Sequence, residues 1–510
     1  MTDMHCGRVL GRIARRVGAV ALAIGTAIAG AGEVQAQVSA TPGGPSGGGT
    51  GTSPSSGAGR SQGSLRVPGS PITFHTANSK GGWFYLAPGI KARWVHDYPV
   101  WSGHPTVEII LAAGVSGHPT QEEKLLLQFP PNLFQIPESE RAIVVAFHPY
   151  GVSYASPFNG SLLPALCEQR NWILLAPMGL NQTNFASVES QNTLDIVMAL
   201  VLKILPFNRE RVYTVGFSMG GLNAVSYAMR KQDPNGIRVA GVINHTGTMD
   251  VIQDYENGSS ALKLILEDDE HFGGSPTEVP FAWERINPTK LTAANKVDPD
   301  RAPATNLVDL PIYLHVNTQD NQQGLVNMTY ALHDYLLSLG ADVFLSEVQA
   351  GSTHHWSTMD MAAALDFIDS GIAPGPAPSK GPVLELFADR EDRYRLSEVL
   401  EIEPNLVANY RIVVQSPAVN AFAVQSTRAV RELALDLAPM KIDPAKVLTI
   451  TTWSADFKAV TLVLRGYAKA PSTITVNGAP PTAWSYDPVT KELSIKPTAN
   501  GSFAVVQVLP

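Results

Sequence analysis

The sequence predicts an α/β fold with a mostly parallel sheet and helices on both faces, followed by a smaller, sandwich-like all-β domain at the C-terminus. Apolar, β-rich runs alternate with helical stretches between about residues 70 and 371, a pattern typical of strands joined by crossover helices. The run Ile372–Pro378, rich in proline and glycine, ends this alternation. Short β-rich runs separated by turn residues such as Asn477-Gly478 then continue to Pro510, as in a β-sandwich.

The first residues resemble an export signal. Four arginines between positions 8 and 16 precede the small apolar run Val17–Ala31, and Val34-Gln35-Ala36 fits a signal-peptidase site. We therefore expect residues 1–36 to be a signal peptide, cleaved near Ala36, and the protein to be secreted or periplasmic. The alternative is an uncleaved anchor, but the apolar run is shorter than the roughly 18 residues of a convincing span, so no stable membrane insertion is expected.

Composition divides the remaining chain. Residues 37–69 are mostly glycine, serine, threonine, proline and alanine, which predicts a disordered spacer without a core of its own. The expected order is then a catalytic α/β domain over residues 70–371, a linker over 372–381 and the β domain over 382–510.

Charge and cysteine content exclude some kinds of partner and site. The chain has 44% hydrophobic residues and a formal charge of −8, which becomes −10 without residues 1–36, since these hold four arginines against Asp3 and Glu33. A net acidic chain without a basic run argues against nucleic acid or anionic lipid as a partner. Cys6 would leave with the signal, so Cys167 has no partner for a disulfide and a cysteine-based metal cluster is excluded. We expect Cys167 to be a packing residue.

The elements of the α/β domain follow from these runs. Strands are expected at Val107–Ala112, Lys124–Phe129, Ala142–Phe147, Trp172–Ala176, Val212–Val215, Val239–Ile243, Ile312–Val316 and Val343–Val348. Helices are expected around Asn192–Ile204, Gly221–Lys231, Leu325–Leu339 and Met359–Ile368. Parallel sheets place reactive groups at the carboxyl ends of their strands.

One such end carries a candidate nucleophile. The strand at Val212–Val215 stops at Gly216, presents Ser218 and passes into a helix within two residues, on the pattern G-x-S-x-G of a nucleophile elbow. Glycines at 216 and 220 leave room for the sharp turn. The alternative is a turn serine that caps a helix.

A serine nucleophile needs a base, and the base needs a group that orients it. In sheets of this kind the acid follows a late strand and the histidine follows the last one. Asp320, a few residues past Ile312–Val316, is our choice of acid, and Asp250, past Val239–Ile243, is the alternative. The base is His354 or His355, which follow Val343–Val348 and which local sequence does not separate.

The oxyanion formed in acyl transfer needs two preorganised N–H donors. The elbow supplies the backbone N–H of Met219. The second is expected from His148-Pro149-Tyr150-Gly151, after the strand Ala142–Phe147, where a turn could aim the N–H of Tyr150 into the site. An ordinary strand-ending turn is the alternative.

These motifs resemble the α/β-hydrolase superfamily, in the branch of extracellular polyhydroxybutyrate depolymerases, feruloyl and acetylxylan esterases and prolyl-oligopeptidase-like enzymes. The resemblance covers about residues 142–368. It includes the oxyanion loop at His148 and the elbow from Gly216 to Gly221. The segment from Gly351 to Trp356 is similar to the branch's G-x-G-H-x-W, which implies that His354 is the base. Pro149 and Thr353 stand where the branch usually has glycine.

The leading hypothesis is therefore a secreted serine hydrolase of carboxylic esters, including polyesters or acylated polysaccharides. One alternative is a prolyl-oligopeptidase-like peptidase with the same triad. Another is a non-catalytic surface- or carbohydrate-binding protein in which Trp453 or Trp484 of the β domain stacks on a ligand. Acyl transfer through this triad requires no cofactor and no metal.

Overall fold

The fold is described from a computed structural model, which describes residues 64–66, 73–75, 82–95, 105–130, 132–369, 373–376, 381–455, 458–497 and 503–510. The predicted signal peptide at 1–36 lies outside the described residues, as does most of the predicted spacer. Strand β1 (Ser64–Arg66) lies inside that spacer, and it pairs antiparallel with β2 (Thr73–His75), which follows the spacer.

The α/β domain is built on a ten-stranded sheet with the order β12-β11-β10-β9-β7-β8-β6-β5-β4-β3. The six strands from β12 to β8 run parallel, and β6, β5, β4 and β3 continue the sheet in antiparallel fashion. The strands are β3 (Phe84–Ala87), β4 (Ile90–Trp94), β5 (Thr106–Leu111), β6 (Glu123–Gln128), β7 (Ile143–Phe147), β8 (Ile173–Pro177), β9 (Val212–Phe217), β10 (Val239–His245), β11 (Pro311–Asn317) and β12 (Asp342–Val348).

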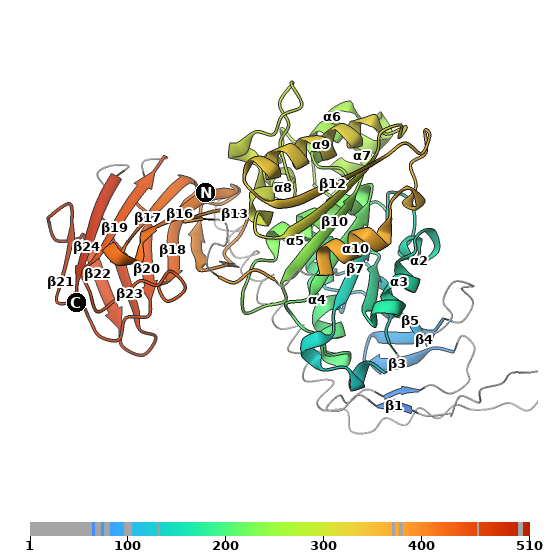
Figure 1. The fold of residues 1–510 in the computed structure, drawn as a ribbon, viewed down its shortest axis with the longest axis horizontal. Helices are drawn as coiled ribbons and strands as arrows, with labels where there is room; N and C mark the ends of the chain where they lie inside the picture. The colour runs from blue at the N-terminus through green and yellow to red at the C-terminus, as the bar shows by residue number, and fades with distance from the viewer. Residues whose placement is uncertain are drawn as a thin grey trace, which may run out of the picture.

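Both faces of this sheet are covered, as the sequence predicts for buried parallel strands. Along β7, Val145 packs into a core shared with α4 (Val188–Ile204), α5 (Met219–Arg230) and α9 (Gln323–Ser338). The next side chain, Val144, points to the opposite core, shared with α3 (Leu163–Arg170) and α10 (Met361–Asp369). The mostly parallel sheet with helices on both faces is therefore confirmed (Figure 1).

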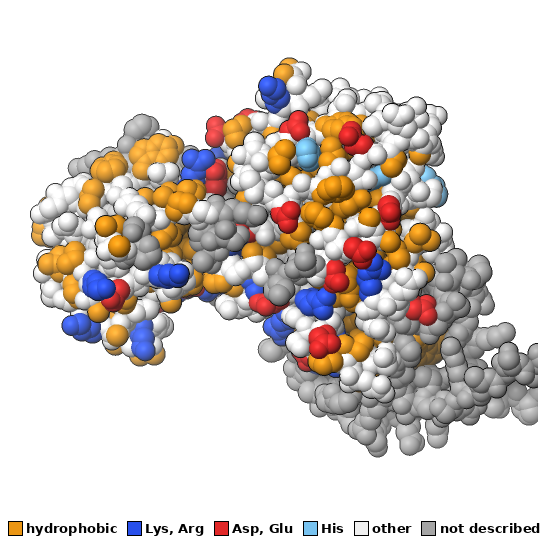
Figure 2. Space-filling model, in the orientation of Figure 1, with side chains coloured by type: hydrophobic (Ala, Val, Ile, Leu, Met, Phe, Trp, Pro, Cys, Tyr) orange, Lys and Arg blue, Asp and Glu red, His pale blue; other side chains and the backbone are white. Residues whose placement is uncertain are grey.

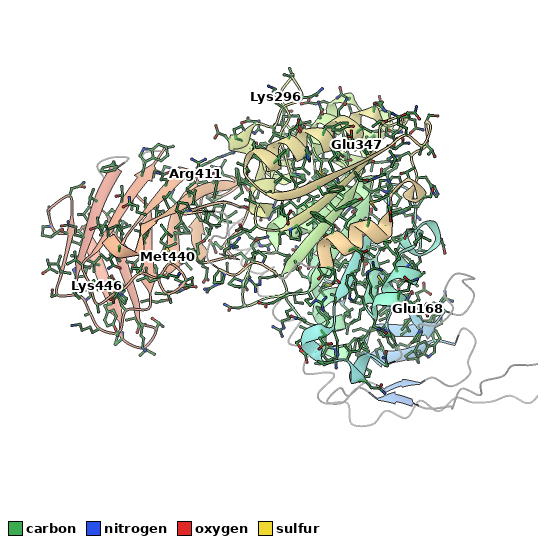
Figure 3. The ribbon with its side chains drawn as sticks, viewed as in Figure 1. Glu168, Lys296, Glu347, Arg411, Met440 and Lys446 are labelled. Carbon is green, nitrogen blue, oxygen red and sulfur yellow. The ribbon has the colours of Figure 1, made fainter. Side chains whose placement is uncertain are left out.

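The remaining helices are short. Several belong to the segment between β10 and β11, which packs around Trp283 and covers Met219 and Leu222 at the start of α5. Figure 3 shows Lys296 at the tip of a loop that projects from this segment. The short helices between β10 and β11 are α6 (Val251–Asn257), α7 (Ser260–Glu267), α8 (Pro280–Glu284), η3 (Pro299–Arg301) and η4 (Pro303–Leu307). Those elsewhere in the α/β domain are η1 (Leu133–Gln135), η2 (Glu138–Glu140), α2 (Ser156–Gly160) and η5 (Trp356–Thr358).

The C-terminal region forms two six-stranded mixed sheets around one apolar core, which confirms the predicted smaller β domain. Their orders are β13-β16-β17-β19-β24-β21 and β14-β15-β18-β20-β23-β22, and one short helix, η6 (Pro417–Val419), lies between β16 and β17. The strands are β13 (Val383–Ala388), β14 (Arg393–Tyr394), β15 (Ser397–Ile402), β16 (Ala408–Ser416), β17 (Ala421–Arg428), β18 (Val430–Asp436), β19 (Leu448–Ser454), β20 (Thr461–Arg465), β21 (Thr473–Val476), β22 (Ala483–Asp487), β23 (Glu492–Lys496) and β24 (Phe503–Leu509).

The two domains meet through buried polar contacts. Asn306 of η4 exchanges hydrogen bonds with the backbone of Phe387 in β13, at 2.8 and 2.9 Å, and also donates to Met229 O at the end of α5. Asp389 binds Arg230 of α5 and Arg285 of the inserted segment, each at 2.8 Å. The β domain is therefore packed against α5, the helix that follows Ser218.

Surface charge is mixed. On the face that Figure 2 shows, acidic and basic side chains are interspersed over the α/β domain. Cys167 is buried in the core beside α10, and burial raises the pKa of its thiol to about 12.

Candidate active site

Ser218 occupies the sharp turn between β9 and α5. Its backbone has φ 58° and ψ −124°, a region that costs a non-glycine residue about 1–3 kcal/mol. A side chain at position 216 would collide with the carbonyl oxygen of Gly220, and one at position 220 with that of Phe147. The two glycines of G-x-S-x-G thus allow the turn and bring the start of α5 against the end of β7.

A hydrogen-bonded aspartate and histidine lie at the same edge of the sheet. Asp320 follows β11, and His354 follows β12, so both come from the carboxyl ends of parallel strands. His354 Nδ1 donates to Asp320 Oδ2 at 2.8 Å, and Asp320 is only 2% exposed. This bond fixes the tautomer of His354 and leaves Nε2 as the proton acceptor.

The ring of His354 is held over the elbow. Its centroid lies 4.4 Å from that of Phe217, the residue before Ser218. The Nε2 atom is buried and has no hydrogen-bond partner among the described residues. In unliganded hydrolases the bond between nucleophile and base is often long and tightens only when substrate binds.

A side chain that the sequence analysis did not single out holds the loop of His354. Asn317, fully buried at the end of β11, donates to Gly351 O at 2.7 Å and Thr353 O at 2.9 Å and accepts from the N–H of Ala350 at 3.0 Å. It therefore ties the end of β11 to the loop that carries His354. A polar residue ending an apolar strand was the only sequence signal for this role.

The alternative acid has other partners. Asp250 is fully buried and caps α6, where it accepts from the N–H groups of Ile252 and Gln253. Its carboxylate also accepts from Leu291 N and Asn287 Nδ2 and lies 3.7 Å from Lys290. The structure does not bring it into contact with His354.

The alternative base faces away as well. His355 is exposed, and its Nδ1 accepts from the N–H of Ser357 and lies 2.9 Å from the Ser357 hydroxyl. It caps η5 rather than approaching an acid.

The two predicted oxyanion donors flank the elbow. Met219 is the first residue of α5, so its N–H has no acceptor within the helix. Tyr150 stands in the turn after β7, and Gly220 packs against the end of that strand. The N–H of the following Gly151 is committed to Gln182 O at 2.9 Å, whereas the N–H of Tyr150 donates to no group in the described part of the chain.

Two further histidines form a buried layer behind His354. The Nε2 atoms of His245 and His315 lie 2.9 and 3.3 Å from the hydroxyl of Thr358, which itself donates to His355 O. Burial lowers the pKa of His245 well below its usual range and that of His315 to about 4, so both rings are neutral at pH 7. The sequence analysis singled out neither ring.

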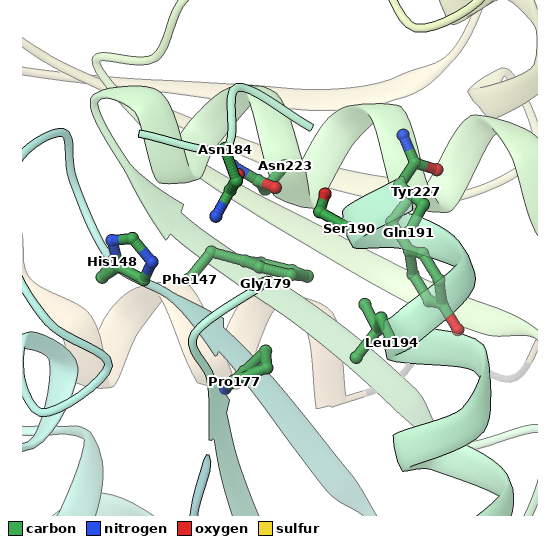
Figure 4. Close-up of a pocket in the computed structure, with 10 residues that line it drawn as sticks. All are labelled: Phe147, His148, Pro177, Gly179, Asn184, Ser190, Gln191, Leu194, Asn223 and Tyr227. Atoms are coloured by element: carbon green, nitrogen blue, oxygen red, sulfur yellow. The ribbon is translucent and has the colours of Figure 1, made fainter. Parts of the chain in front are cut away.

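A cavity of about 10 Å³, roughly the size of one water molecule, lies beneath the oxyanion loop (Figure 4). His148 and Tyr227 stand at opposite ends of its lining in this view. Neither Ser218 nor His354 borders it. Its lining residues are Phe147, His148, Pro177, Gly179, Asn184, Ser190, Gln191, Leu194, Asn223 and Tyr227.

The part of the chain that the structure describes contains no group of three or more acidic, histidine or cysteine side chains arranged to hold a metal ion. Within the same residues, every helix is too short or too polar to span a bilayer.

Comparison with known proteins gives fold-level similarity. No family model matches the sequence, and the comparison with curated proteins found no match. Similar solved structures include a fluorophosphonate-binding serine hydrolase of Staphylococcus aureus (12% identity, TM-score 0.38, 52% of this chain and 100% of that chain). Others are an S-formylglutathione hydrolase from Agrobacterium tumefaciens (12%, 0.40, 55% and 99%) and an acetyl xylan esterase from Paenibacillus sp. R4 (11%, 0.38, 56% and 89%).

The fold is assigned from the order and direction of the strands. Six parallel strands in the order β8-β7-β9-β10-β11-β12 are bordered by antiparallel β6, and a strained serine turn follows β9. The described residues between 82 and 369 have the α/β-hydrolase fold.

Proposed function

We propose that this protein is a serine hydrolase of carboxylic esters. The observation that carries the proposal is the 2.8 Å hydrogen bond between His354 and buried Asp320, beside the strained turn of Ser218. Ser218 Oγ attacks the acyl carbon while His354 Nε2 takes its proton, and Asp320 stabilises the imidazolium. The N–H groups of Tyr150 and Met219 bind the oxyanion. The alcohol leaves with the proton from His354, and water then hydrolyses the acyl-enzyme in the same way.

We further propose that the enzyme acts outside the cytoplasm, after cleavage near Ala36, on polymeric esters such as polyesters or acylated polysaccharides. The arginine-led apolar segment and the glycine- and serine-rich spacer support export. A second domain beside the catalytic one is an arrangement often met in enzymes of insoluble substrates, which is an analogy of architecture.

The test is turnover of short-chain p-nitrophenyl esters by residues 37–510, beside the Ser218→Ala variant at equal concentration. Ester hydrolysis that disappears in Ser218→Ala supports the proposal. Cleavage of peptide amides without ester turnover would favour a peptidase instead. Equal turnover by both forms would exclude Ser218 as the nucleophile.

A further inference from the structure

The loop 178–187, between β8 and α4, contacts the oxyanion loop at three points. His148 Nε2 lies 2.8 Å from Met178 O, and the N–H of Gly151 donates to Gln182 O at 2.9 Å. The rings of Tyr150 and Phe185 are 5.6 Å apart. Because Tyr150 lies between two anchored residues, the direction of its N–H follows the position of this loop.

Three residues of this loop have strained backbone conformations. Leu180, Phe185 and Ala186 have φ values of 73°, 41° and 55°, which residues other than glycine rarely adopt. Such conformations persist only where the surroundings impose them.

Glu123 of β6 supplies the main polar support for the first half of the loop. Its side chain is fully buried, and its Oε1 accepts from the N–H groups of Met178 at 2.9 Å and Gly179 at 3.1 Å. Its Oε2 accepts from the N–H of Leu180 at 2.7 Å. The N–H of Met178 is shared with Lys124 O, whereas Gly179 and Leu180 donate to Glu123 alone. Three consecutive N–H groups thus converge on one carboxylate, as in an anion-binding nest.

No neighbouring side-chain charge explains a buried carboxylate at this place. Among the described residues, Glu123 has no ion-pair partner. Lys124 pairs with Glu122 at 3.9 Å on the surface, and His148 faces the carbonyl of Met178. Burial raises the pKa of Glu123 to about 7, against the three backbone hydrogen bonds that lower it. An ionisable group is thus retained in the core where it only binds this loop.

We propose that Glu123 is a positioning residue for the oxyanion hole: its carboxylate fixes residues 178–180, and through them the oxyanion loop that carries the Tyr150 N–H. Glu123 touches no reacting atom. The inference rests on the proposed function, because it needs an oxyanion to form at Ser218.

The test compares a p-nitrophenyl ester with its thionoester, in which sulfur replaces the carbonyl oxygen. Sulfur is a weaker hydrogen-bond acceptor, so an intact oxyanion hole favours the oxygen ester. In Glu123→Gln the amide nitrogen cannot accept from the backbone, so at least one N–H loses its acceptor. We expect kcat for the oxygen ester to fall tenfold or more, with KM changed less than about threefold, and the ratio of oxygen-ester to thionoester rates to fall about tenfold.

The matched control is Asp254→Asn. Asp254 is a half-buried carboxylate whose pKa is likewise raised by burial, to about 6, but it lies in α6 and binds Thr248 instead of the loop 178–187. This variant should change both rates by the same factor. A wild-type ratio in folded Glu123→Gln would overturn the proposal. Absence of ester turnover in the wild type would instead count against the proposed function.

A measurement on the unmodified protein covers the case in which Glu123→Gln fails to fold. Protonation of Glu123 removes one acceptor, so the ratio of oxygen-ester to thionoester rates should fall between pH 8 and pH 6. Any ionisation that changes both rates by the same factor cancels in the ratio. A ratio that stays constant from pH 8 to pH 6 would overturn the proposal.

Discussion

At the scale of single residues, Asp250 and Asp320 differ only in their partners. Both follow a parallel strand, and both are almost fully buried. One carboxylate oxygen of Asp320 accepts a hydrogen bond from His354. The oxygens of Asp250 accept instead from backbone N–H groups of its own segment and from Asn287. The first arrangement fixes the orientation of the His354 ring, and the second holds together the segment between β10 and β11.

The two asparagine variants should therefore fail in different ways. Asp320→Asn should lower kcat for ester hydrolysis by about three to four orders of magnitude, because His354 then takes the wrong tautomer. Asp250→Asn should keep most of its activity but lose about 1–3 kcal/mol of stability, since a buried acceptor is lost. Rates and urea unfolding of both variants check this. Full activity in Asp320→Asn would remove Asp320 from the triad.

The sequence placed residues at strand ends but could not reveal which contacts support them. Ser218, Asp320 and the pair His354-His355 were selected because parallel strands bring their carboxyl ends to one edge. The resemblance of the following segment to G-x-G-H-x-W then favoured His354. The partners of Asn317 lie at 350–353, and those of Glu123 at 178–180, so their roles depend on loop conformations that one sequence does not specify.

At the scale of elements, strands buried on both sides were predictable because their apolar runs are continuous, as in β7 to β11. Some strands with mixed patterns were not predicted. β4 alternates buried and half-buried residues, and β22 is mostly exposed. β18 has the sequence VRELALD, whose glutamate, leucines and alanine favour a helix, yet it pairs with β15 and β20 around the core of the β domain. Tertiary packing overrides local preference there.

The histidine layer at the ends of β10 and β11 should make stability depend on pH. Burial lowers the pKa of His245, and the neighbouring rings of His315, His354 and His355 lower it further. Burial also lowers the pKa of His315 to about 4, although the charge of Asp320 acts to raise it. Both rings stay neutral in the fold, whereas the unfolded chain binds protons below about pH 6.5. Stability is therefore full above that pH and falls as the pH drops towards 4.

His315 alone should cost up to about 3 kcal/mol over this interval. Urea unfolding at pH 7.5, 6 and 5 measures the loss, and His315→Asn should reduce its slope. The matched control is His333→Asn, since His333 lies on α9, away from the histidine layer, and its Nδ1 bonds Asp334 of the same helix. Equal slopes for the wild type and His315→Asn would show that this ring does not titrate on unfolding.

At the scale of the whole molecule, the β domain contacts α5 directly, through Asp389 and Arg230. Burial alone would raise the pKa of Asp389, but Arg230, Arg285 and Arg390 outweigh it and hold that pKa well below its usual range. Arg230 in turn donates to Gln191, whose amide binds Ala186 O in the loop 178–187. A polar path thus runs from the β domain to the loop beside the oxyanion turn.

Removing Asp389 should therefore uncouple the two domains. Asp389→Ala leaves Arg230, only 4% exposed, without its carboxylate, and breaking a buried pair in this way typically costs about 3–5 kcal/mol. The matched control is Asp366→Ala, which removes the 69% exposed partner of Arg170 and should cost less than about 1 kcal/mol. In urea, residues 37–510 should unfold in one transition for the control and in two for Asp389→Ala, because the β domain keeps its own core after the contact is lost. A single transition at the same urea midpoint in both variants would show that the domains are held together by other contacts, such as those of Asn306 with Phe387.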